Sequence, residues 1–63
     1  MTKAELMMWK TNLINAALSA ARAKGDEAVK YVLARYDASS LESLAECYFP
    51  DVFAALEDMA KAD

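Results

Sequence analysis

Residues 3–24 have the sequence KAELMMWKTNLINAALSAARAK and are followed by Gly25, the only glycine of the chain. Alanine, leucine, methionine and lysine dominate this stretch, and all four are strong helix formers. Thr2 precedes the stretch as an N-cap, with Glu5 three residues later as the acid of a capping box. Glycine is a natural helix end. The stretch therefore predicts a long first helix over residues 3–24.

Two apolar flanks share this helix when its residues are placed at about 100° intervals. The first consists of Trp9, Leu13, Ala16 and Ala20, and the second of Met7, Ile14, Leu18 and Ala21. Together they span roughly 200°, whereas a single packing contact needs about 100°. We therefore expect the helix to contact two neighbours. Because the core of so short a chain is small, we also expect self-association, most simply a symmetric homodimer through this helix.

Shorter helical segments follow. Asp26 and Glu27 open a second helix of roughly ten residues, because acidic side chains suit the positive end of a helix dipole. Ser39 and Glu42 form another capping box ahead of a short helical turn near residues 40–46. Pro50 biases the residue before it away from helical geometry and fits the first turn of a last helix, so a bend at residues 48–49 and a helix over about residues 50–61 are expected.

The predicted fold is all-α: a small three- to four-helix bundle with a long N-terminal helix, forming a single helical domain over residues 1–63. Its expected core consists of Leu6, Leu13, Ala17, Val29, Val32, Leu33, Leu41, Leu44, Phe49, Val52, Leu56 and Met59. The single cysteine, Cys47, excludes an intrachain disulfide, and the absence of histidine excludes a Cys/His zinc site within one chain. Cys47 is expected to be a small buried apolar residue.

Membrane insertion and secretion are not expected. No apolar run approaches the roughly 18–20 residues that cross a bilayer, since Lys10 and Asn12 interrupt the first stretch. The N-terminus also lacks the basic start and uninterrupted apolar segment of a signal peptide. The expected location is the cytoplasm of a bacterial or phage-infected cell.

Enzymatic function is not expected either. The chain lacks histidine, the commonest general base, and one glycine does not make a phosphate-binding loop or a nucleophile elbow. The carboxylates Glu42, Glu46, Glu57 and Asp58 lie at predicted caps or on solvated faces. We therefore expect no catalytic residue, no metal and no cofactor.

The first helix carries the candidate interaction surface. Met8 lies on its polar face, and an exposed methionine beside a tryptophan is typical of an adaptable binding surface. Trp9 itself has two interpretations, a core residue or an interface residue. The candidate surface for a protein partner comprises Met7, Met8, Trp9, Leu13, Ala16 and Ala20.

Charge is distributed unevenly and leaves a second interpretation open. Residues 1–36 carry a net charge of +3 and residues 37–63 a net charge of −6, which gives −3 for the chain. In the alternative, a nucleic-acid accessory protein of recombination or replication, Lys24, Lys30, Tyr31 and Arg35 contact phosphates and bases. A pI of about 4.7 favours a protein partner instead.

The C-terminal half carries a recognisable arrangement of aromatic and leucine residues. From residue 29 onward a helix ends at an aromatic residue, a short turn leads to two leucines, and a Tyr or Phe precedes a last amphipathic helix. The positions concerned are Leu33, Tyr36, Leu41, Leu44, Tyr48, Phe49 and Leu56. This arrangement resembles small helical accessory proteins of phages and prophages, encoded near recombination or replication genes. Asp37 and Ala38 depart from it, because a glycine is common after the aromatic residue. The matching positions are packing residues, so the resemblance transfers no functional residue.

Overall fold

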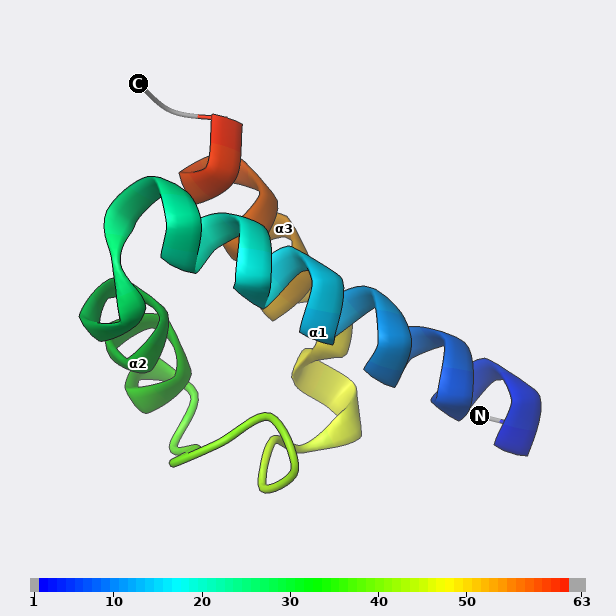
Figure 1. Ribbon diagram of the computed structural model, residues 1–63. Coiled ribbons are helices and arrows are strands. Elements are labelled where there is room, and N and C mark those ends of the chain that lie inside the picture. The colour runs from blue at the N-terminus through cyan, green and yellow to red at the C-terminus, as the bar shows by residue number, and fades with distance from the viewer. Residues whose placement is uncertain (1, 62–63) are drawn as a thin grey trace.

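Three α-helices make up most of the computed structural model, which describes residues 2–61 (Figure 1). They are α1 (Lys3–Lys24), α2 (Asp26–Arg35) and α3 (Phe49–Lys61), and a short 3-10 helix, η1 (Glu46–Tyr48), precedes α3. Residues 2–61 contain no strand. The predicted all-α class is therefore confirmed.

Both ends of α1 follow from local sequence, as predicted. The Thr2 hydroxyl accepts a hydrogen bond from the backbone N–H of Glu5 at 3.1 Å and donates one to the Glu5 carboxylate at 3.0 Å. At the other end Gly25 has a φ of 93°, and its N–H donates to the carbonyl oxygen of Ala21 at 2.7 Å. Because glycine adopts positive φ without a steric penalty, the chain turns there and α2 begins at the next residue.

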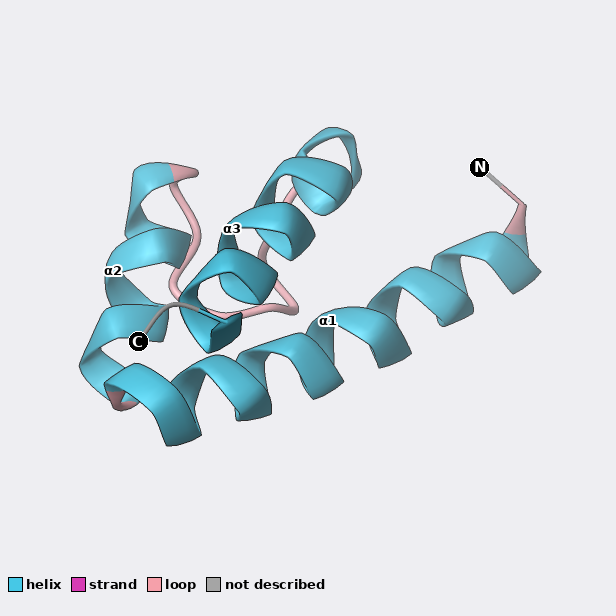
Figure 2. Ribbon diagram, turned by 90° about the horizontal axis from the view of Figure 1, so that it is seen from above, coloured by secondary structure: helices cyan, strands magenta, loops and turns pink. Residues whose placement is uncertain are grey.

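The helices α2 and α3 both pack against α1 (Figure 2). Figure 2 shows them on the same side of α1, while the N-terminal turns of α1 extend past both. The molecule is accordingly elongated, with extents of 35 × 20 × 14 Å. As expected, α1 has two neighbours, but both belong to its own chain.

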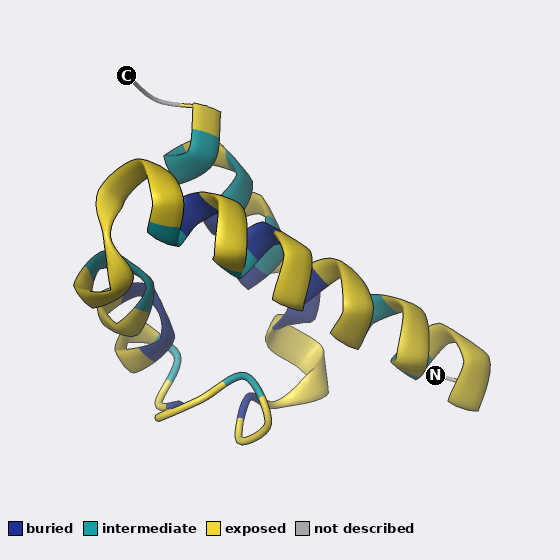
Figure 3. Cartoon of the chain, viewed as in Figure 1, coloured by how far each residue is buried: buried dark blue, intermediate teal, exposed yellow. Residues whose placement is uncertain are grey.

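The core is apolar and is formed by α1, α2, α3 and the segment that joins α2 to η1 (Figure 3). No polar or charged side chain is buried in the part of the chain that the structure describes. The buried side chains are Leu13, Ala16, Ala20, Val32, Leu33, Ala38, Leu44, Phe49, Val52 and Leu56.

Three alanines distinguish this core from the expected one. The prediction missed Ala16, Ala20 and Ala38, all of which are buried. Small side chains at positions 16 and 20 leave room for a neighbouring helix to pack closely against α1. Several expected core residues are only half-buried and line the edge of the core instead, namely Leu6, Ala17, Val29, Leu41 and Met59.

The segment between α2 and η1 does not form the predicted helical turn near residues 40–46. It consists of bends and turns. The Ser43 hydroxyl accepts hydrogen bonds from the backbone N–H groups of Ser39 and Ser40, each at 3.1 Å, and donates to the carbonyl oxygen of Ser40 at 3.0 Å. Serine hydroxyls compete with helical hydrogen bonds in this way. The Ser43 hydroxyl thus stabilises a turn, and the predicted capping box of Ser39 and Glu42 does not form.

The predicted bend before Pro50 is also wrong. Phe49 has helical angles, φ −53° and ψ −51°, and η1 leads directly into α3. A residue before proline is normally biased away from these angles. Here the Phe49 ring is buried in the core, and burial of an aromatic side chain outweighs the local bias.

A left-handed residue closes α2. Asp37 has a φ of 58°, the N–H of Ala38 donates to the carbonyl oxygen of Leu33 at 3.0 Å, and the N–H of Asp37 donates to that of Ala34 at 3.1 Å. These two bonds are a Schellman motif, whose left-handed position is usually glycine.

Replacing Asp37 by glycine is therefore expected to stabilise the protein. Removing the side chain relieves the left-handed strain, and the gain should be about 0.5–1 kcal/mol after the greater flexibility of unfolded glycine is subtracted. Urea denaturation followed by circular dichroism measures this free energy of unfolding. A destabilised Asp37→Gly variant would contradict the motif.

Candidate functional site

The first flank of α1 is core and not surface. Leu13, Ala16 and Ala20 are buried, so the prediction that these three belong to an interaction surface is corrected. Trp9 is half-buried on the same side, and its ring meets that of Phe53 edge-on with centroids 5.9 Å apart and an interplanar angle of 79°. Of the two interpretations of Trp9, the structure therefore supports the packing role.

The two methionines beside Trp9 are exposed on different faces of α1. Met7 is 63% exposed and Met8 is 64% exposed. Met7 lies one heptad before Ile14, on the second flank. Met8 lines a shallow hollow of about 250 Å³ with Glu5, Trp9 and Asn12, on the other side of the helix. Met7 and Met8 are thus on two different faces of α1, and the other four residues of the predicted surface lie on the packed first flank.

The second flank of α1 is the exposed apolar face. Ile14 is 51% exposed and Leu18 is 56% exposed, and with Met7 they follow one another at helical spacing. We call these three residues the outer stripe. A wide apolar arc was visible in the sequence, but both flanks carry large aliphatic residues. Only the alanines at positions 16 and 20 indicated which flank packs closely against another helix.

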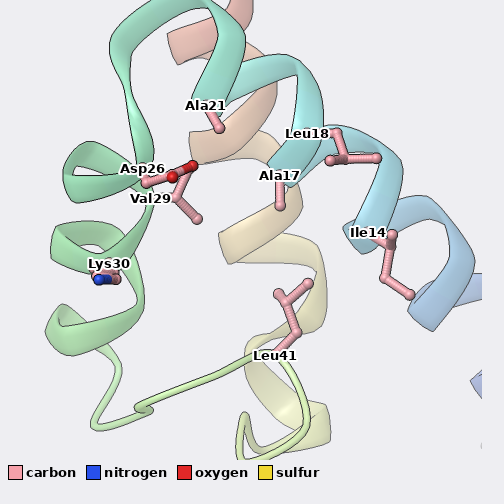
Figure 4. A pocket seen from close by; sticks show the side chains of 8 residues that line it. All are labelled: Ile14, Ala17, Leu18, Ala21, Asp26, Val29, Lys30 and Leu41. Carbon is pink, nitrogen blue, oxygen red and sulfur yellow. The ribbon is translucent and has the colours of Figure 1, made fainter.

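A groove runs beside the outer stripe. One hollow of about 340 Å³ lies between α1 and the start of α2, and Figure 4 shows its walls. Its lining residues are Ile14, Ala17, Leu18, Ala21, Asp26, Val29, Lys30 and Leu41. A second hollow of about 350 Å³ is lined by Lys10, Leu13, Ile14, Leu41 and Glu42. The hollows share Ile14 and Leu41, so they adjoin along α1.

The residues of the nucleic-acid alternative are all solvent-exposed. Lys24 ends α1, whereas Lys30, Tyr31 and Arg35 lie on α2, where Tyr31 is 68% exposed. The Lys30 ammonium lies 3.5 Å from the Glu27 carboxylate, one turn earlier. A carboxylate therefore shares this face, which weakens its attraction for phosphate.

Cys47 is exposed as a free thiol in η1, contrary to the expected burial. The rings of Tyr48 and Tyr36 pack with centroids 5.1 Å apart. In residues 2–61 no three His, Cys, Asp or Glu side chains are grouped so that they could hold a metal ion. Nor does any helix in this part of the chain have an apolar stretch long enough to span a bilayer.

Comparison with known proteins gives no assignment. No protein-family model matches the chain, and the searches of curated proteins and of solved structures found no match.

Proposed function

We propose that this chain is a non-enzymatic protein-interaction module that binds another protein through the outer stripe of α1. The observation that carries the proposal is the exposure of Met7, Ile14 and Leu18 beside a groove, in a chain whose other helices already cover the opposite flank. Burying the remaining surface of Ile14 and Leu18 contributes about 1 kcal/mol each. Such a stripe at helical spacing suits helix-in-groove recognition.

Two narrower statements belong to the same proposal. The three helices form a small bundle in one domain, which presents α1 as a rigid binding face. The resemblance of the C-terminal half to phage and prophage accessory proteins supports a more specific role. In that role the chain is a phage or mobile-element regulator that acts in the cytoplasm on a host or viral protein. A second copy of the chain is one candidate partner.

Capture from an extract of the source cell tests the proposed function. Immobilised wild-type protein is compared with Leu18→Asp, which places a charge in the outer stripe, and with Met8→Asp, the matched change of an equally exposed residue on the polar face. Wild type and Met8→Asp should retain the same partner, and Leu18→Asp should lose at least about tenfold, equivalent to 1.4 kcal/mol. Equal capture by both variants, with unchanged circular dichroism, would remove the outer stripe from the binding surface.

The exposed Tyr31 between Lys30 and Arg35 keeps nucleic-acid binding as the second candidate, because exposed aromatic rings beside cations stack on bases. We expect no binding of labelled single- or double-stranded DNA or RNA, even at low salt. Binding that falls steeply with ionic strength, and is lost on charge reversal of Lys30 and Arg35 but not of Lys61, would instead favour this candidate.

A further inference from the structure

The charges that line the groove beside the outer stripe balance one another. The hollow along the N-terminal half of α1 is lined by Lys10 and Glu42, and the hollow along the C-terminal half by Asp26 and Lys30. Ile14 lines both hollows and lies where they meet. A two-fold axis sets one patch of a protein against the same patch of a second copy, so a patch with a net charge would repel itself. This groove carries one cation and one carboxylate in each half and can therefore face itself.

The outer face of α1 also complements itself in the sizes of its side chains. Met7 and Ala21 lie seven residues before and after Ile14, on the same side of the helix. When a second α1 lies antiparallel across this face with the two-fold axis at Ile14, the large Met7 of each copy lies opposite the small Ala21 of the other. Met7 and Ile14 are exposed, and Ala21 is half-buried. Pairing a large side chain with a small one lets two helices approach closely.

Charge along α1 distinguishes an antiparallel from a parallel arrangement. Lys3 and Lys10 lie seven residues apart on the groove side of α1, in its N-terminal half. Asp26 lines the groove at the C-terminal end of α1 (Figure 4). A parallel pair would bring the lysines of both copies together, and such like-charge contacts cost affinity. The antiparallel pair instead sets Asp26 of one copy at the level of the lysines of the other. None of these three residues forms an ion pair within residues 2–61, so all three are available to a partner.

We propose that the groove binds a second copy of this chain, in a symmetric dimer whose α1 helices cross antiparallel at Ile14. This inference rests on the proposed function and names its partner. The sequence predicted a dimer through α1 without showing which flank forms it. The first flank is buried against the chain's own helices, which leaves the outer stripe. The contact from Met7 to Ala21 spans about 21 Å of helix. An interface of this size is small, so we expect weak, reversible association with a dissociation constant in the micromolar range.

Sedimentation equilibrium of the full chain tests whether the dimer forms. The apparent mass should rise from 6.9 kDa towards twice that value between micromolar and millimolar protein concentrations. Leu18→Asp should weaken dimerisation at least about tenfold, because it places a charge in the outer stripe. Met8→Asp, the matched change of an equally exposed residue on the polar face, should leave dimerisation unchanged. Circular dichroism of both variants confirms that they are folded. A monomer at all concentrations, or equal dimerisation of the two variants, overturns the proposal.

Single cysteines locate the two-fold axis. Cys47→Ser removes the exposed native thiol, and Ile14→Cys, Leu18→Cys and Met7→Cys are then made separately in that background. An axis at Ile14 brings the two thiols of Ile14→Cys together. It leaves the two copies of position 18 about 12 Å apart and those of position 7 about 21 Å apart along the helices, which is too far for a disulfide.

Oxidation with diamide should therefore produce disulfide-linked dimers from Ile14→Cys and not from Leu18→Cys or Met7→Cys. The double variant Met7→Cys/Ala21→Cys should also crosslink, because the antiparallel pair sets these two positions opposite each other. Crosslinks from all three single variants would indicate a parallel pair. That result, or the absence of crosslinks from both Ile14→Cys and Met7→Cys/Ala21→Cys, would contradict the proposed arrangement.

Capture from the source cell separates this proposal from the proposed function. If the proposal is correct, the partner that wild type retains and Leu18→Asp loses is the chain itself. If the chain stays monomeric but Leu18→Asp still loses a different captured protein, the second copy is the wrong partner and the proposed function stands. If the chain is monomeric and capture is unaffected by Leu18→Asp, both fail. A monomer that cosediments with phosphatidylglycerol-containing vesicles, and no longer does so as Leu18→Asp, would assign the groove to a membrane and overturn the proposal.

Discussion

Replacing Leu56 by alanine is expected to remove a large part of the protein's free energy of unfolding. Leu56 is 0% exposed and lies on α3 in the centre of the core. Truncating a buried leucine costs about 2–5 kcal/mol, through lost burial and the cavity that remains. A chain of 63 residues has a total stability of about 3–9 kcal/mol at typical values per residue. A loss of this size is comparable to the total stability at the lower end of that range.

Urea denaturation of Leu56→Ala, followed by circular dichroism, measures this loss. The matched control is Leu18→Ala, the same chemical change at a residue of the outer stripe, which should alter stability by less than about 0.5 kcal/mol. Similar losses in the two variants would mean that Leu18 is as deeply packed as Leu56, and the outer stripe would then not be a free surface.

Enlarging Ala20 to leucine is expected to destabilise the protein by about 1–3 kcal/mol, because a fully packed position has no space for the added carbons. Ala20 is 0% exposed on the buried flank of α1. Its control is Ala23→Leu, an exposed alanine of the same helix, for which little change is expected. Thermal unfolding of both variants provides the comparison. An Ala20→Leu variant that kept its stability but lost its partner would restore the first flank as the interaction surface.

The two ends of α1 were predictable because each depends on neighbours in sequence. Thr2 and Glu5 cap the start of α1, and Gly25 ends it. The segment after α2 was not predictable by the same rules. Ser39 and Glu42 fit a capping box in the sequence. In the structure, however, the Ser43 hydroxyl accepts the hydrogen bonds of the Ser39 and Ser40 backbone N–H groups, and Ala38 and Leu44 are buried on either side of the turn. Packing against the rest of the molecule, and not local sequence, determines that this segment forms a turn instead of a capped helix.

The candidate site was predicted in part, for a similar reason. Helical periodicity showed that α1 has more apolar surface than one contact requires, and Met8 is exposed as expected. Periodicity does not show which flank meets α3. That depends on how closely two helices approach, and the alanines at positions 16 and 20 make the first flank the closer fit. The outer stripe belongs to the other flank, which remains exposed.

Photo-crosslinking in the source cell tests the central claim most directly, that the outer stripe and not the rest of α1 binds another protein. A benzophenone amino acid is placed at Leu18, and in a separate variant at Asn12, an exposed residue on the polar side of the same helix. The account predicts discrete protein adducts from position 18 and none from position 12, with both variants folded. Adducts from position 12 alone, or equally from both positions, would contradict it.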